Sequence, residues 1–156
     1  MATINKFQEL EVWKFSKEMA VTAFKTFNNV NDAYSRLLIS QLIRSVVSVP
    51  SNIAEGFERE GRKEFINFLS IAKGSNGEFL TQLMIAKEVG IIAENEYDKL
   101  SSLSHQIGLM LRKLIQYLTQ SNYKGQKFNS SVEESISDYK MKELTPDILN
   151  AIASVL

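Results

Sequence analysis

The sequence predicts an all-α protein, an up-down antiparallel four-helix bundle with a flexible C-terminal tail that ends in a short helix. Four long segments repeat apolar residues at helical spacing. The 156 residues include only two prolines and seven glycines, too few for the many turns of a β-sandwich or barrel. Short links join segments of comparable length, which favours antiparallel neighbours. We therefore expect a bundle over residues 1–120 and a linker with a short amphipathic helix over residues 121–156.

The first predicted helix runs from Glu9 to Asn28. Its apolar residues recur every three or four positions, which is typical of a helix with one side toward a core. The residues expected on that side are Leu10, Trp13, Ala20, Phe24 and Phe27, with Val12, Met19 and Ala23 beside them. Asparagine and aspartate at positions 28, 29, 31 and 32 are turn formers, so they end the helix.

The second predicted helix runs from Ala33 to Arg59 and contains Pro50. At about 100° per residue, the apolar positions before and after Pro50 stay in one sector. We therefore expect one continuous helix with a bend at Pro50. The apolar arc spans roughly 180° by the same period, whereas one packed face needs about 100°. The extra width indicates a second contact, either within the bundle or with another subunit.

The third predicted helix runs from Arg62 to Gly90, with Gly61 before it and Gly90 as a natural C-terminal cap. Asn76 falls on its core side, so we expect there either a buried amide with partners or a local helix distortion. The fourth predicted helix begins near Glu94 and carries a near-heptad seam. The seam consists of Tyr97, Leu100, Ser104, Ile107, Leu111, Leu114 and Leu118.

The tail differs in composition from the bundle. From Ser121 to Glu143 it is rich in Ser, Asn, Lys and Glu without periodicity, which predicts a flexible linker. Thr145 and Pro146 then form a cap and a first-turn proline for a short helix that ends at Leu156. Roughly eleven residues cannot hold a helix alone. If ordered, this segment docks on the bundle or on a neighbouring subunit.

The charge balance removes any overall attraction to nucleic acid or to anionic membranes. Lys plus Arg and Asp plus Glu both total 18, so such binding requires a local patch. The chain has no cysteine, which excludes disulfides and thiol nucleophiles. No signal-peptide pattern is apparent, and no stretch approaches the roughly 18 to 20 apolar residues of a membrane span. We therefore expect a soluble, cytoplasmic protein.

Four stretches resemble one protein family. They are Phe7–Trp13 (FQELEVW), Val49–Phe57 (VPSNIAEGF), Lys63–Leu69 (KEFINFL) and Thr81–Leu83 (TQL). In this order they are similar to the four-helix-bundle family named for open reading frames in intervening sequences of 23S ribosomal RNA genes. The resemblance extends from about Phe7 to Leu118. It implies a bacterial, non-enzymatic bundle that associates as a ring-shaped homopentamer.

Relatives in this family include the accessory variability determinant of diversity-generating retroelements. That relative looks like a basic protein that binds nucleic acid and a reverse transcriptase, so the resemblance implies RNA, DNA or a reverse transcriptase as partners. This chain departs from those strongly basic relatives, because its sequence pI is about 6.6. A neutral chain attracts phosphates less than a basic one.

The candidate nucleic-acid-binding residues are basic side chains of the second and third predicted helices. They are Arg36, Arg44, Arg59, Arg62, Lys63 and Lys73. In a ring any such patch is repeated, and repetition can make a modest patch effective. The alternative interpretation is a solvated, salt-bridged face, because Glu55 precedes Arg59 by four residues and Glu58, Glu60 and Glu64 are interleaved.

Nothing in the sequence indicates catalysis. The sole histidine, His105, has no carboxylate at one-turn spacing, and the Glu-x-x-His pairs of carboxylate-bridged metal bundles are absent. We expect no catalytic residue, no metal and no cofactor. Two hypotheses remain. The first is a homo-oligomeric scaffold, expected to be pentameric, that presents a repeated surface to RNA, DNA or a nucleic-acid-handling protein. The second is a pure protein-interaction module without nucleic-acid binding, in which the tail helix docks.

Overall fold

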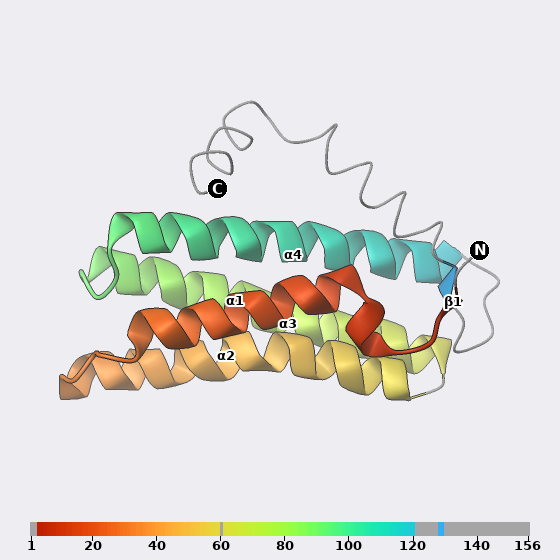
Figure 1. Cartoon of the computed structure of the whole chain (residues 1–156), viewed down its shortest axis with the longest axis horizontal. Coiled ribbons are helices and arrows are strands. Elements are labelled where there is room, and N and C mark those ends of the chain that lie inside the picture. Colours follow the sequence, from red (N-terminus) through yellow and green to blue (C-terminus); the bar gives the residue numbers. More distant parts are fainter. Residues whose placement is uncertain (1–2, 60, 121–127, 130–156) are drawn as a thin grey trace, which may run out of the picture.

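The computed structural model describes residues 3–59, 61–120 and 128–129. Four helices form its body: α1 (Glu11–Phe27), α2 (Ala33–Glu58), α3 (Arg62–Glu88) and α4 (Glu94–Gln120). They lie side by side and alternate in direction (Figure 1). α2 packs between α1 and α3, and α4 packs against both α3 and α1. The predicted all-α, up-down four-helix bundle is confirmed.

The N-terminal residues differ from the prediction. A 3-10 turn, η1 (Phe7–Glu9), precedes α1 and contacts both α1 and α2. Leu10 follows in extended conformation and is buried, so α1 begins at Glu11 and not at Glu9. The rings of Phe7 and Trp13 meet edge to face with centroids 5.1 Å apart. Packing of the turn against α1 and α2 therefore sets this helix start.

Two short strands were not predicted. β1 (Thr3–Ile4) pairs antiparallel with β2 (Phe128–Asn129). A pairing between distant segments leaves no local periodicity in the sequence, so the composition of the predicted linker gave no sign of it. The other residues of the predicted linker, Ser121 to Glu143, and the predicted helix from Thr145 to Leu156 lie outside the described residues.

Asp32 caps the start of α2, which was not predicted, and Gly90 ends α3 as expected. Asp32 accepts a hydrogen bond from the Ser35 backbone N–H at 2.8 Å, and the side-chain hydrogen bond with Ser35 lowers the pKa of Asp32. At the end of α3, the backbone N–H of Gly90 donates to Lys87 O and that of Ile91 to Ala86 O. Gly90 has a φ of 74°, which a glycine adopts without strain. This is the Schellman termination that the sequence predicted.

Pro50 lies inside α2, and the helix continues through it. Figure 1 shows α2 as one unbroken ribbon (Figure 1). Val49 and Ile53, on either side of the proline, are fully buried, so the apolar phase is kept. Two side chains after Pro50 bond to carbonyls of the preceding turn, Ser51 Oγ to Val47 O at 2.9 Å and Asn52 Nδ2 to Ser48 O at 2.8 Å. The predicted continuity is confirmed.

The core runs along the bundle axis. Its largest fully buried side chains are Phe79, Leu10, Met19, Leu42, Ile53, Leu69, Leu83, Leu100, Ile107, Leu111, Leu118 and Val46. Phe24 is not among them, because 52% of it is exposed, and its predicted core position is wrong. The fully buried stripe of α1 runs through Met19 and Ala23. Phe24 lies one residue, about 100°, beyond Ala23 around the helix.

α2 has an unusual composition for a helix at the surface of a bundle. By length and composition it is apolar enough to cross a membrane, with a mean hydropathy of 1.3 in its most apolar window. The expectation that no stretch approaches the length and apolar composition of a membrane span is therefore wrong for α2. The high value arises because one side of α2 is in the core, while its outer side is also poor in charge.

Candidate functional site

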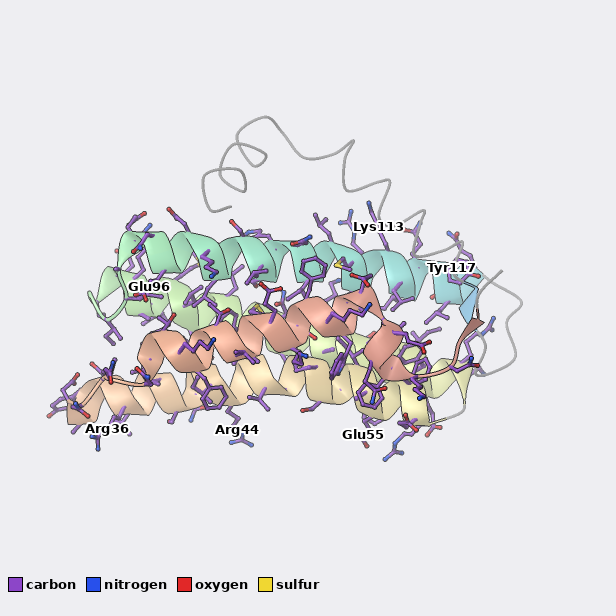
Figure 2. The ribbon with its side chains drawn as sticks, viewed as in Figure 1. Arg36, Arg44, Glu55, Glu96, Lys113 and Tyr117 are labelled. Atoms are coloured by element: carbon purple, nitrogen blue, oxygen red, sulfur yellow. The ribbon has the colours of Figure 1, made fainter. Side chains whose placement is uncertain are left out.

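The six candidate basic residues do not form one patch. Arg36 lies near the start of α2 and Arg44 in its middle, whereas Arg59, Arg62 and Lys63 lie where α2 meets α3. Lys73 lies in the middle of α3. Arg36 and Arg59 are separated by about 35 Å along α2, at 1.5 Å per residue. Figure 2 shows Arg36, Arg44 and Glu55 at separate levels along the outer side of α2 (Figure 2).

The structure therefore brings together only three of the six, Arg59, Arg62 and Lys63, which we call the corner cluster. Arg59 is the C-terminal cap residue of α2, and Gly61 caps the N-terminus of α3. Arg62 and Lys63 occupy the first turn of α3. Lys63 is exposed and Arg62 is partly buried. A phosphate could reach this corner from solvent.

Arg59 is engaged by its own chain. Its Nη2 donates to Glu55 Oε1 at 2.8 Å, and its Nη1 lies 3.7 Å from Glu64 Oε1. The guanidinium also lies over the ring of Phe68, 4.9 Å from the ring centroid. The side chains of the pairs are about half exposed, so each pair contributes little energy. Together they orient the guanidinium along the helix surface and neutralise part of the cluster.

The corner itself is built by close packing of α2 on α3. A Cβ added at Gly56 would lie 2.5 Å from Phe68 Cβ, so only glycine allows the helices to approach this closely. Phe57 and Phe65 meet edge to face, with centroids 5.9 Å apart. Gly56 and Phe57 are the last two residues of the stretch VPSNIAEGF, which carries the family resemblance. Through them the stretch packs α2 on α3 at the corner where Arg59 lies.

Polar side chains bridge α2 and α3 along the rest of their contact. Ser45 Oγ donates to Gln82 Oε1 at 2.7 Å, and the hydroxyls of Ser48 and Ser75 are 2.8 Å apart. Ser45 and Ser75 are buried. Buried polar groups need partners, and these pairs satisfy each other. They set the register of the two helices, and we assign them no role in binding.

Asn76 forms a similar bridge between α3 and α4. Its Nδ2 donates to the carbonyl oxygen of Ser104 at 2.9 Å, and Ser104 Oγ donates to Asn76 Oδ1 at 3.1 Å. Asn76 is 6% exposed and Ser104 fully buried. The predicted buried amide with partners is confirmed, and α3 continues through Asn76 without a break.

Sequence reasoning missed the Phe68 ring under Arg59, and it named Glu64 only as one of several acidic residues interleaved with the basic ones, without assigning it to Arg59. Their spacing from Arg59 crosses the α2–α3 turn, so no helical period relates them. The expected i,i+4 pair of Glu55 with Arg59 is present. At the corner, Lys63 is exposed to solvent while Arg59 is paired with carboxylates of its own chain.

The rest of the described surface offers no site for a metal. Among residues 3–59, 61–120 and 128–129, no group of three or more His, Asp or Glu side chains could hold a metal ion. His105 is exposed on α4 and its Nδ1 lies 2.8 Å from the carbonyl oxygen of Ser101, one turn before it.

At the opposite end of the bundle from the corner cluster, Lys87 donates a hydrogen bond to Glu94, and this bond raises the pKa of Lys87.

Comparison with known proteins places this bundle among others of its kind. The family model described as 23S rRNA-intervening sequence protein matches residues 8–113. A crystal structure of a protein of unknown function from Bacteroides thetaiotaomicron, described as belonging to the S23 ribosomal protein family, is 27% identical. The match covers 67% of this chain and 98% of that protein's chain, with a TM-score of 0.64. No curated protein matches the chain.

Proposed function

The chain belongs to the 23S rRNA-intervening sequence protein family, and from this premise we propose that it is a non-enzymatic, homo-oligomeric scaffold of the bacterial cytoplasm. In this proposal the protein is a pentamer that presents a repeated surface to RNA, to DNA or to a protein that handles nucleic acid, such as a reverse transcriptase. The pentamer and the partner class come from the family resemblance of the sequence.

One observation carries the oligomeric part of the proposal. Large apolar side chains remain exposed on the outer sides of α2 and α3 and at Val89, the residue that caps the C-terminus of α3. Leu37 is 69% exposed, Val89 61%, Ile71 50% and Ile85 46%. Single exposed apolar residues are ordinary on a monomer. Exposed apolar residues gathered on two adjacent helices are typical of a surface that another protein covers.

The corner cluster is the proposed contact for nucleic acid. Arg59, Arg62 and Lys63 lie at one end of the bundle, and a pentamer would carry five copies of them. Each copy is weak, because Glu55 and Glu64 pair with Arg59. Repetition raises the effective affinity only when several copies reach one ligand. We therefore propose binding that depends on phosphates and not on base sequence.

The alternative is a pure protein-interaction module that does not bind nucleic acid. The observation that favours it is the pairing of Arg59, which leaves the corner close to neutral. The chain as a whole is also neutral, with a formal net charge of +0. Under this alternative the repeated surface contacts only proteins.

A salt titration separates the two. Binding of a labelled single-stranded RNA, and of a duplex DNA of matching sequence, is measured by fluorescence anisotropy for the full chain at several salt concentrations. We expect weak binding at low salt that is much weaker at about 150 mM. The triple variant R59E/R62E/K63E should bind less at low salt and show a flatter salt slope, with unchanged oligomer mass.

The matched control reverses three other exposed lysines, K17E/K25E/K99E, which changes the net charge equally. Equal losses in both variants would contradict the corner as the site. Absence of binding even at low salt would favour the protein-interaction module. Light scattering coupled to gel filtration tests the assembly in the same samples, and a pentamer has about five times the chain mass of 17.7 kDa. A monomer at micromolar concentration would refute the scaffold.

A further inference from the structure

The outer side of α2 carries almost no charge through its middle. Six positions between Leu37 and Ser51 are exposed, and only Arg44 among them is charged. On α1, by contrast, four of the six exposed positions are charged. Charged side chains are depleted at the centres of protein interfaces. The middle of α2 thus has the composition of a covered surface.

The outer side of α3, next to it, has the same character. Of the ten exposed positions from Asn67 to Ile85, only Lys73 and Glu78 are charged. Gly74 and Gly77 also lie there, and a Cβ added at either would meet nothing within 4 Å. Glycine destabilises a helix interior relative to alanine, and no packing inside this bundle requires it. Glycine does allow another backbone to approach closely.

Arg44 and Glu78 lie at about the same height on the bundle. The hydrogen bond of Ser45 with Gln82 and the contact of Ser48 with Ser75 place the two helices in register. Arg44 precedes Ser45, and Glu78 lies between Ser75 and Gln82. Among the described residues, neither charge forms an ion pair. Figure 2 shows Arg44 pointing away from the bundle (Figure 2).

Each of these two charges is the centre of a heptad row. Leu37, Arg44 and Ser51 follow one another every seven residues on α2, and Ile71, Glu78 and Ile85 do so on α3. Positions seven residues apart lie on one line of a helix, which suits packing against a second helix at a small crossing angle. The two rows carry opposite charges at their centres. Apolar side chains stand at both ends of the α3 row, Ile71 and Ile85, and at one end of the α2 row, Leu37, whose other end is Ser51.

We propose that the outer face of α2 in one copy packs antiparallel on the outer face of α3 in the next, with Arg44 paired to Glu78 of the neighbouring copy. In this arrangement Leu37 meets Ile85 of the neighbour, Ser51 meets Ile71, and Gly74 lets the helices approach. The inference rests on the proposed function, because it requires that the chain self-associates. The inference adds that the chain associates through the outer faces of α2 and α3 and that Arg44 and Glu78 form the charge pair between copies.

A second copy of the chain covers this surface, because the α2 face of one copy is complementary in charge to the α3 face of another. α2 offers one positive charge and α3 one negative charge at matching height. A contact of α2 with α2 about Arg44 would instead oppose two like charges, which disfavours association. Because the two charges lie at about the same height, pairing them requires only a small shift of neighbouring copies along the bundle axis. A contact with little shift can close into a ring, whereas a strongly shifted contact grows into a filament.

Charge exchange tests the pair on the full chain. Light scattering coupled to gel filtration gives the mass of the wild type, of R44E, of E78R and of the double variant R44E/E78R. We expect each single variant to fall from the wild-type mass to 17.7 kDa, because each opposes like charges at every contact. The double variant should regain the wild-type mass. An equimolar mixture of R44E and E78R should associate, although neither does alone.

The matched controls K25E and E18R change the charge of exposed positions on α1, and they should keep the wild-type mass. Far-UV circular dichroism confirms the helical fold of each variant. An independent variant, Gly74→Trp, should also dissociate, whereas Ser102→Trp on the exposed side of α4 should not. A wild type that is monomeric refutes the proposed scaffold. An oligomeric wild type whose mass survives R44E and E78R refutes only the α2–α3 contact.

Discussion

Asn76 of α3 and Ser104 of α4 exchange two hydrogen bonds inside the bundle, one from the amide to a backbone carbonyl and one from the hydroxyl to the amide oxygen. Both residues are buried. Their distances of 2.9 and 3.1 Å fix the level at which α3 meets α4. Gly108 lies beside the pair, since a Cβ there would be 3.4 Å from Asn76 Nδ2.

The first prediction concerns this pair. Asn76→Ala should lower the free energy of unfolding by about 1–3 kcal/mol, because it removes both hydrogen bonds between α3 and α4 and takes away the amide acceptor of the buried Ser104 hydroxyl. Urea unfolding followed by circular dichroism, at one fixed protein concentration, measures the loss. The exposed Asn67→Ala on the same helix is the control and should stay within about 0.5 kcal/mol of wild type. The double variant N76A/S104A should lose less stability than the sum of the losses of N76A and S104A measured separately. Strict additivity would show that the two residues are not coupled.

The second prediction concerns Gly56. Gly56→Ala should destabilise the protein by about 1–3 kcal/mol, because the new Cβ would overlap Phe68 and force α2 away from α3. Thermal unfolding measures this change. Gly108→Ala in α4 is the matched control, since its new Cβ would approach only the end of a side chain. A stabilised Gly56→Ala would mean that the α2–α3 corner adapts without strain.

The third prediction concerns Pro50. The proline removes one hydrogen bond from the middle of α2, at a cost of about 3 kcal/mol when nothing compensates. Pro50→Ala should therefore raise the free energy of unfolding by up to about 3 kcal/mol. The control is Ser40→Ala, an exposed position of the same helix. If the Pro50 variant is instead less stable, the proline ring contributes more by packing than its missing N–H removes.

The fourth prediction follows from the lowered pKa of Asp32. A folded pKa below the ordinary value of 3.8 means that the carboxylate stabilises the fold above that pH. This contribution is lost as pH falls through the folded pKa. Asp32→Asn keeps an N-cap acceptor and removes the charge. The stability difference between wild type and variant should therefore shrink between pH 7 and strongly acidic pH. If the stability difference were the same at pH 7 and at strongly acidic pH, the helix-cap hydrogen bond would not be the origin of the lowered pKa.

Several features of the fold could be predicted from sequence because they depend on neighbours within one helix. The four helices, the passage of α2 through Pro50 and the Gly90 termination all follow from local periodicity and from the backbone preferences of proline and glycine. The burial of Asn76 was predicted in the same way, because its position in the apolar period of α3 is set within that helix.

The candidate site could be predicted only as a list of residues. Helical periodicity gave the i,i+4 pairing of Glu55 with Arg59. It could not show that Phe68 and Glu64 reach the same guanidinium from the next helix. Nor could it show that Arg36 and Lys73 lie far from the corner, because separation in space depends on how the helices are docked.

The sequence by itself determined which segments become helices and where most of them end, since those choices are made by hydrogen bonds and side chains within a few residues of each other. Only the tertiary structure decided the rotation of each helix about its axis and its height against its neighbours. The rotation left Phe24 exposed, and the height placed Arg44 level with Glu78. Both are set by the packing of side chains from different helices, as at Gly56 against Phe68, and such contacts leave no periodic trace in a single chain.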